Sequence, residues 1–215
     1  MAIVNDKKKF IFFHLYKCGG TSLRTLLNKK FKENQEVLSG HCLPRDLKYH
    51  YYFRGKEYED KFDEMFKFTI IRNPFDFLLS TYHYARAYTH HFWHNDVINM
   101  EFNDFPKFYV DKINTSKQID ETSYGSNKIT TPYEFIRDYD GKVIVDFVAK
   151  LENIEKDMDF ILKKLRIKSI DFPLVNVNIN NDKPYQLVYD KPTRDFVEKH
   201  FAKDFEYFEY QWIDL

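Results

Sequence analysis

The chain has 215 residues, 43% of them hydrophobic, and its 33 basic and 33 acidic residues give a formal net charge of +0. A neutral chain gives no reason to expect non-specific binding to nucleic acid, and no apolar run reaches the roughly 18 residues that a membrane span needs. We therefore expect a single domain over residues 1–215 with one sizeable core. The first ten residues contain no signal-peptide pattern, so we expect a cytoplasmic protein or a domain cut from a longer one.

Strands and helices are predicted to alternate along the chain. Strand patterns cover residues 9–15, 67–72 and 143–149, and helix patterns cover residues 21–31, 75–88, 153–166 and 192–201. Such alternation is typical of an α/β fold, in which a mostly parallel sheet is flanked by helices. Residues 88–131 interrupt the pattern with a polar stretch of poor periodicity. In a domain of this size such a long irregular stretch is either a functional lid or a surface loop, and both remain open.

The most informative segment is Phe10–Leu27. Its apolar run Phe10–Phe13 predicts a buried strand, and Thr21–Ser22 open an amphipathic helix. Between the two lie Lys17 and the pair Gly19–Gly20. The first turn of a helix has N–H groups without partners and a favourable dipole for anions, and glycines let the backbone approach a bulky anion closely. The segment therefore predicts a site for a phosphate or a similar group.

A second segment, Phe68–Tyr84, repeats the strand-to-helix pattern. Arg72 stands at the carboxyl end of the predicted strand, Pro74 suits the first turn of a helix, and Ser80 lies further along that helix. In open α/β sheets ligands bind at the carboxyl ends of the strands. Arg72 is therefore a second candidate ligand for an anion, with a surface ion pair as the alternative.

Together the two segments resemble the family-2 type of sulfotransferase, which includes the heparan, chondroitin and dermatan sulfotransferases and bacterial relatives. The first family motif, roughly h-H-I-P-K-[TC]-G-G-T-S-L, is matched by His14–Leu23, with Tyr16 in place of the usual proline. The second, roughly h-h-R-[DN]-P-h-x-R-h-h-S-x-[YF], is matched with Phe77 where many relatives have another arginine. Looser similarity extends over residues 8–212, at 145–157, 174–178 and 193–210.

The resemblance implies a P-loop-like nucleotide fold and 3′-phosphoadenosine 5′-phosphosulfate (PAPS) as the donor. Lys17 is then a catalytic residue that acts on the leaving group and also binds the donor. Arg72 and Ser80 bind the 3′-phosphate of the donor. The residues that bind the 5′-phosphosulfate, mainly through their backbone, are Cys18, Gly19, Gly20, Thr21 and Ser22. The implied acceptor is a hydroxyl group, most simply that of a carbohydrate, and no metal is expected to be required.

Sulfuryl transfer to a hydroxyl needs a base, and a histidine with a pKa near neutrality suits that role. His41 follows Gly40 just after the first predicted helix, and several relatives carry a Gly-His pair there. His41 is therefore the predicted base. The alternative is a carboxylate of the 88–131 stretch, Glu101 or Asp104, if that stretch is an acceptor-side lid.

Two other groups of residues are considered for metal or redox chemistry. His90 and His94 are four residues apart and would share a helix face, but Asp96 is the only further ligand in an obvious position, so no metal site is expected. Cys18 and Cys42 cannot form a disulfide framework and are expected to be reduced thiols.

Two other functions remain possible on the sequence. A small-molecule kinase with a divergent phosphate loop is disfavoured because its lysine would follow the second glycine, whereas Lys17 precedes both. A non-catalytic protein that binds nucleotides or glycans, with the loop kept and turnover lost, is the second alternative that the two motifs leave open. The sequence predicts neither the identity of the acceptor nor the oligomeric state.

Overall fold

The computed structural model describes residues 2–37, 42–116, 130–167 and 183–214. The chain forms two compact units, one made of Met1–Ile71 and Thr122–Asn176 and the other of Arg72–Glu121 and Val177–Leu215. The first unit contains a five-stranded sheet, and the described part of the second is helical. The two units are described separately below.

The sheet of the first unit has the strand order β3-β1-β2-β4-β5. Its strands are β1 (Ala2–Asn5), β2 (Phe10–Phe13), β3 (Gln35–Val37), β4 (Phe66–Ile71) and β5 (Phe147–Lys150). Strands β2, β4 and β5 pair in parallel, whereas β1 pairs antiparallel with both β2 and β3. The carboxyl ends of β2, β4 and β5 therefore share one edge of the sheet.

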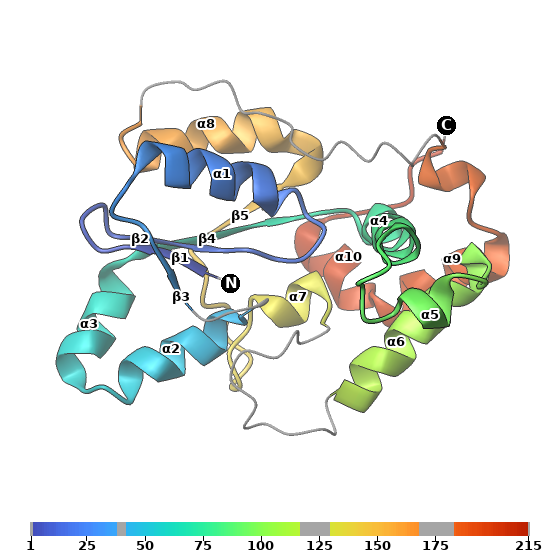
Figure 1. Ribbon diagram of the computed structural model, residues 1–215, viewed down its shortest axis with the longest axis horizontal. Coiled ribbons are helices and arrows are strands. Elements are labelled where there is room, and N and C mark those ends of the chain that lie inside the picture. Colours follow the sequence, from blue (N-terminus) through green and yellow to red (C-terminus); the bar gives the residue numbers. More distant parts are fainter. Residues whose placement is uncertain (1, 38–41, 117–129, 168–182, 215) are drawn as a thin grey trace. The chain divides into compact units, whose positions relative to one another are not determined.

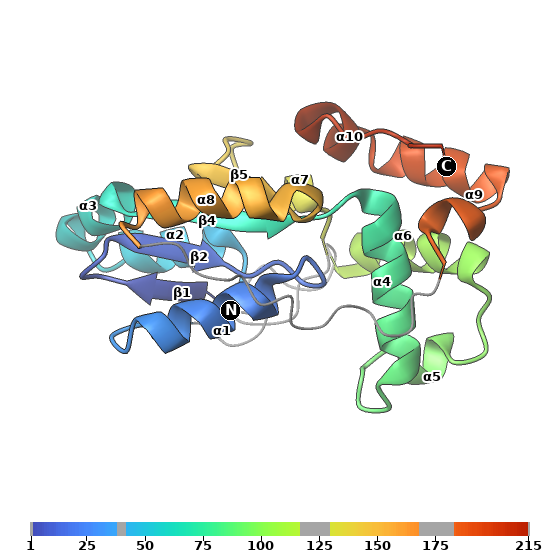
Figure 2. The same cartoon turned by 90° about the horizontal axis from the view of Figure 1, so that it is seen from above.

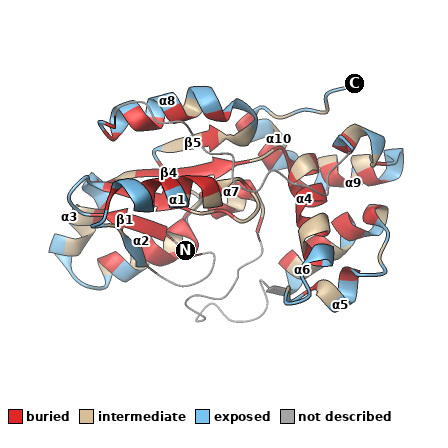
Figure 3. Ribbon diagram, turned by 45° about the horizontal axis from the view of Figure 1, so that its top comes forward, coloured by how far each residue is buried: buried red, intermediate tan, exposed pale blue. Residues whose placement is uncertain are grey.

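Helices cover both faces of this sheet, as Figures 1 and 2 show. Helices α1 (Gly20–Lys30) and α8 (Ile154–Lys164) lie on one face, and α2 (Pro44–Tyr52) and α3 (Lys56–Glu64) lie on the other. The short helix α7 (Pro132–Phe135) also belongs to this unit. Strands β1, β2 and β4 are largely buried between the two helix layers (Figure 3), which explains why β2 is a continuous apolar run rather than an alternating one.

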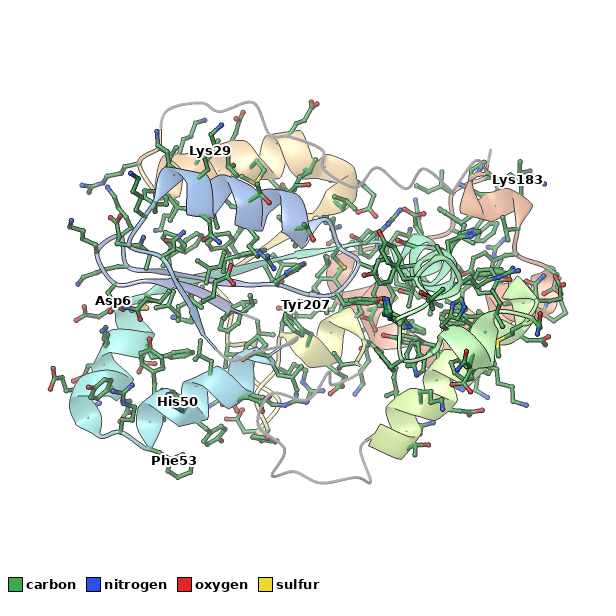
Figure 4. The ribbon with its side chains drawn as sticks, in the orientation of Figure 1. Asp6, Lys29, His50, Phe53, Lys183 and Tyr207 are labelled. Atoms are coloured by element: carbon green, nitrogen blue, oxygen red, sulfur yellow. The ribbon has the colours of Figure 1, made fainter. Side chains whose placement is uncertain are left out.

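Aromatic rings fill the centre of the sheet unit. Phe10, Phe12 and Phe68 are fully buried, with ring centroids 6.1 Å apart for Phe10 and Phe68 and 5.4 Å apart for Phe12 and Phe68. Polar and exposed side chains lie outside this layer, and Phe53 at the end of α2 points into solvent (Figure 4) with 79% of its surface exposed. The core therefore lies at the pairing of β2 with β4, directly below the loop that leaves β2.

The second unit is built from helices that connect through short segments. They are α4 (Pro74–Ala87), α5 (His94–Val97), η1 (Phe102–Asp104), α6 (Phe105–Ser116), η3 (Tyr185–Leu187), α9 (Lys191–His200) and α10 (Ala202–Phe208). Helices α4, α6 and α9 pack against one another. Among the described helices of the chain, none is long and apolar enough to cross a membrane.

A cluster of rings fixes the start of α4 in the second unit. Phe75 contacts four aromatic rings at centroid distances between 4.9 and 5.5 Å: Tyr185, Tyr189, Phe205 and Trp212. The hydroxyl of Tyr189 also donates to the backbone carbonyl of Phe75 at 2.9 Å. The C-terminal part of the chain thus holds the first turn of α4 in place.

The structure confirms the α/β fold and most predicted elements. Strands β2 and β4 and helices α1, α4, α8 and α9 begin and end within three residues of their predicted bounds, whereas β5 begins at Phe147 rather than 143. The expectation of irregular chain over residues 88–131 is wrong for Phe105–Ser116, which form α6. The looser family string at 174–178 lies outside the described residues.

Candidate functional site

The loop between β2 and α1 makes a sharp turn at the carboxyl edge of the sheet. Strand β2 ends at Phe13, and α1 begins at Gly20. Two residues of this loop have left-handed backbone conformations, Lys17 with φ 56° and Gly19 with φ 76°. Glycine adopts that conformation readily, but lysine does so at a cost, and residues held in this way are concentrated at functional sites.

The N-terminus of α1 is free of acidic side chains. Gly19 is the N-cap and has no side chain to accept a hydrogen bond, and no acidic residue lies in the first turn. The amide of Ser22 donates to the carbonyl of Gly19 at 3.2 Å. The positive end of the helix dipole and the N–H groups of the first turn are therefore not neutralised by a carboxylate of their own helix. This arrangement suits an anionic ligand.

The side chains of the loop differ in their exposure. Cys18 and Ser22 are buried, whereas Lys17 and Thr21 are partly exposed. The thiol of Cys18 thus faces the core, and the loop would contact a ligand through its backbone and through the side chains of Lys17 and Thr21. Cys18 and Cys42 are both buried and belong to no disulfide, as expected for reduced thiols.

Both glycines of the loop are closely packed against side chains. A Cβ atom added to Gly20 would lie 2.7 Å from Nε2 of His14, whose ring stacks on Phe12 with a centroid distance of 6.0 Å. A Cβ added to Gly19 would lie 2.7 Å from Cδ1 of Leu151, which follows β5. The loop is therefore confined by residues that follow two strands, β2 and β5, which are separated in the sheet by β4. The sequence motif gave no sign of the contacts with His14 and Leu151.

The start of α4 presents the second candidate group. Asn73 is the N-cap and accepts a hydrogen bond from the amide of Phe75 at 3.0 Å, and Pro74 occupies the first helical position. Arg72, directly before this cap, donates from Nε to Oδ2 of Asp76 at 2.6 Å. The ion-pair alternative considered for Arg72 is thus realised, although its partner Asp76 was not identified from the sequence. The signal was present, since the two residues are four apart at a helix start.

Ser80 follows Asp76 by one turn of α4, so these two residues lie on one side of the helix, and Arg72 directly precedes its N-cap. Ser80 is buried, with 1% of its surface exposed. Phe77, at the position where many relatives have an arginine, is also buried and packs edge-on against Tyr109 at 5.7 Å. The second motif of this chain therefore contains one arginine, Arg72. The position where many relatives have a second arginine is occupied by Phe77, which belongs to the core.

The predicted base cannot be placed. His41 lies outside the described residues, which resume at Cys42 just before α2. The alternative bases Glu101 and Asp104 are exposed carboxylates at the start of η1 and α6. Among described histidines, His83 on α4 has its pKa lowered by burial and by the nearby charge of Arg86. His83 was not considered from the sequence, because neither family motif includes it.

The histidine-rich segment does not form the expected helix face. His90 and His94 do not share a helix face, because α5 begins only at His94. Nδ1 of His94 lies 3.2 Å from the carbonyl of Ala85, and the ring of His91 stacks on Phe92 at 4.5 Å. Within the described ranges, no group of three or more His, Cys, Asp or Glu residues could hold a metal ion.

A family model described as "Sulfotransferase family", of the family-2 type, matches residues 1–211. This chain belongs to the sulfotransferase family. The match covers nearly the whole chain and confirms the resemblance seen in the two motifs, together with the P-loop-like α/β fold class. No curated protein and no solved structure matches the chain significantly. Membership supports sulfuryl transfer in general and favours it over the kinase alternative.

Proposed function

We propose that this sulfotransferase moves the sulfuryl group of PAPS to a hydroxyl group of a carbohydrate acceptor. The observation that carries the proposal is the loop ahead of α1. Two of its residues, Lys17 and Gly19, have left-handed backbone conformations, and it leads into a helix N-terminus without acidic residues. The chain that carries this loop is a member of the sulfotransferase family. Such a loop suits a doubly charged phosphosulfate better than a neutral ligand.

In this proposal the backbone from Cys18 to Ser22 binds the 5′-phosphosulfate. Lys17 stabilises the negative charge that develops on the oxygen bridging phosphorus and sulfur as the S–O bond breaks. His41 accepts the proton of the acceptor hydroxyl as the new O–S bond forms. The products are a sulfate ester and adenosine 3′,5′-bisphosphate, and the proton leaves on His41.

The second motif is proposed to bind the 3′-phosphate. The guanidinium of Arg72 offers charge-assisted hydrogen bonds to phosphate oxygens, and Ser80 offers a hydroxyl. Arg72 directly precedes the N-cap of α4 and Ser80 lies on that helix, and this origin in one segment supports a shared ligand. Because Ser80 is buried, we assign the larger share of the binding energy to Arg72.

The nucleotide specificity is tested by thermal unfolding with added nucleotides. Adenosine 3′,5′-bisphosphate should raise the melting temperature more than AMP or ATP at equal concentration, because only the bisphosphate offers a separate 3′-phosphate. Equal shifts of the melting temperature with AMP and with the bisphosphate would contradict the proposed 3′-phosphate site. Stabilisation that requires ATP and Mg²⁺ would instead support a kinase.

Turnover is tested with radiolabelled PAPS and a pooled panel of polysaccharides, oligosaccharides, phenols and lipids. Label should appear in a carbohydrate, and a metal chelator should leave the rate unchanged. Transfer to a phenol or lipid alone would replace the carbohydrate acceptor. Tight binding of the bisphosphate without transfer to any acceptor would indicate a non-catalytic binding protein.

A further inference from the structure

The Arg72–Asp76 ion pair has an unusual division of hydrogen-bond donors. Nε and Nη2 of Arg72 both approach the same carboxylate oxygen, Oδ2 of Asp76, at 2.6 and 2.5 Å. The hydrogen bond comes from Nε and the contact of Nη2 is an ion pair, so one edge of the guanidinium faces Asp76. The other edge of the guanidinium, which carries Nη1, also has N–H donors and faces away from Asp76. The arginine side chain is 15% exposed, so its conformation is held largely by neighbours.

The position of Asp76 is itself fixed by the fold. It is the third residue of α4, directly after Phe75, whose ring lies in the cluster described above and whose amide is capped by Asn73. Burial raises the pKa of Tyr189 well above its usual value, and the nearby charge of Asp76 adds to this effect. The charge of Asp76 therefore acts on Tyr189 as well as on the guanidinium of Arg72.

We propose that Asp76 is a positioning residue, which orients Arg72 so that its remaining donors point at the 3′-phosphate of the donor nucleotide. This inference rests on the proposed function. A free arginine side chain loses its rotamer freedom on binding, whereas one already held by a carboxylate has lost it beforehand. The opposing effect is repulsion between the carboxylate and the phosphate. If removing the charge of Asp76 weakens binding of the bisphosphate, the ordering of Arg72 is the larger effect. If it strengthens binding, repulsion of the phosphate is the larger effect.

The test compares the affinity of wild type and Asp76→Asn for adenosine 3′,5′-bisphosphate and for AMP by calorimetry. Asparagine keeps the shape of the side chain and is tolerated in the first turn of a helix, but it loses the charge that holds the guanidinium. The bisphosphate should bind about tenfold more weakly, the scale of ordering one arginine side chain. The affinity for AMP, which has no 3′-phosphate, should be unchanged.

Two controls separate positioning from stability. Asp195→Asn makes the same chemical change in the exposed ion pair of Asp195 with Lys191 on α9, and it should change neither affinity. Asp76→Glu keeps the charge and should retain most of the preference for the bisphosphate over AMP. An Asp76→Glu variant that loses the preference as fully as Asp76→Asn would assign the effect to helix structure and overturn the proposal.

A double-mutant cycle completes the test. Arg72→Ala should weaken bisphosphate binding by roughly tenfold to a hundredfold, and in that background Asp76→Asn should have no further effect. If Asp76→Asn binds the bisphosphate as tightly as wild type, or more tightly, the carboxylate competes with the ligand and the inference is wrong. If wild type does not prefer the bisphosphate over AMP, the proposed function itself fails.

Discussion

Gly19 and Gly20 are adjacent in the loop ahead of α1, but different physical constraints act on them. Gly20 is constrained by contact alone, because an added Cβ would meet the ring of His14. Gly19 is constrained both by contact with Leu151 and by its left-handed backbone, with φ 76°. Truncating the neighbouring side chain would relieve a steric contact, but it would not change the left-handed backbone conformation of Gly19.

This difference gives a testable prediction. Gly20→Ala should destabilise the protein by about 1–3 kcal/mol through overpacking. The same change in a His14→Ala background should cost nothing, because alanine is the better helix former. The measurement is urea unfolding of the four variants of the cycle.

Gly19→Ala is the matched comparison. In a Leu151→Ala background it should still cost about 1–2 kcal/mol, the usual penalty of a left-handed conformation for a residue with a Cβ. Equal rescue at both glycines would show that the backbone conformation of Gly19 is not a constraint. No rescue of Gly20→Ala would show that His14 is not its obstacle.

The proposed roles of Lys17 and His41 predict different kinetic defects. Lys17→Ala should lower turnover at every pH and also weaken donor binding, because the ammonium group acts on the leaving group. His41→Ala should leave bisphosphate affinity nearly unchanged and lower turnover by about 10²–10⁴-fold, the usual scale of general acid–base catalysis. Steady-state kinetics across pH, with calorimetry of the bisphosphate, measure both.

An acidic phenol as acceptor separates the two roles further. Such a hydroxyl loses its proton with less help, so it should partly restore turnover to His41→Ala but not to Lys17→Ala. Wild-type turnover of His41→Ala on a sugar acceptor would place the base elsewhere. Glu101, Asp104 and His83 would then be the next residues to substitute.

Individual residues were predictable from the sequence where a motif fixes the backbone. The lysine and the glycines of the first loop and the arginine after β4 follow from their place in a strand–turn–helix pattern, and the structure places them in such turns. The contacts of His14 with Gly20 and of Arg72 with Asp76 were not predicted. They depend on rotamers and on the distance between chain segments, which spacing alone does not give.

At the scale of elements, predictability follows length and periodicity. Strand β4 and helix α4 were found because a long apolar run leads into a proline-started helix. Strands β1 and β3 have four and three residues and were not predicted. Strand β2 is as short as β1, but it was predicted because all four of its residues are large and apolar and lead into a glycine turn and a helix. Helix α6 buries Phe105, Tyr109 and Ile113 at helical spacing, but the polar residues on both sides of it obscured that signal.

Strand β4 also contains a lysine that the apolar pattern does not explain. The ammonium group of Lys67 donates to the carbonyls of Phe62, Asp63 and Met65 at 3.2, 3.2 and 2.6 Å. These carbonyls lie at the end of α3, where the last turn of a helix lacks donors of its own. The charge is 3.4 Å from the carboxylate of Asp146. Lys67 thus joins the end of α3 to β4.

Lys67→Met is therefore expected to lower the free energy of unfolding by about 1–3 kcal/mol, since the carbonyl of the buried Met65 loses its hydrogen bond from the ammonium group. Binding of adenosine 3′,5′-bisphosphate should be unchanged, because Lys67 lies near the start of β4, whereas Arg72 follows the other end of this strand. Urea unfolding and bisphosphate calorimetry measure the two quantities.

Lys61→Met is the matched control, because Lys61 forms an exposed ion pair with Asp6 at 2.7 Å. Its cost should be about 0–1 kcal/mol, as for most surface pairs. Equal costs for Lys61→Met and Lys67→Met would mean that the carbonyls at the end of α3 find other donors, and Lys67 would then have no special role.

At the scale of the whole molecule, the chain is notable for its 16 tyrosines and zero net charge. Burial raises the pKa of Tyr189 well above its usual value and also raises the pKa of Tyr51 and Tyr84. For Tyr52, burial and then a hydrogen bond to Asp63 raise the pKa to about 12. For Lys48, burial acts to lower the pKa, but the hydrogen bond and charge of Asp138 outweigh it and raise the pKa.

All five groups have a raised pKa in the folded state, so the folded protein holds these protons more tightly than the unfolded chain. Their contribution to stability is complete below the unfolded pKa values of about 10 and is lost as the pH rises through the folded values. The free energy of unfolding should therefore decline between about pH 10 and pH 12, and tyrosinate absorbance should rise together with the loss of circular dichroism.

Tyr52→Phe should make this decline shallower, although by less than its full pKa shift implies because Tyr52 is partly exposed and screened by solvent. Tyr207→Phe, at a position that is 49% exposed, is the control and should leave the slope unchanged. Tyrosine ionisation that is complete before the protein unfolds would show that burial does not hold these protons, and the predicted alkaline instability would then have another origin.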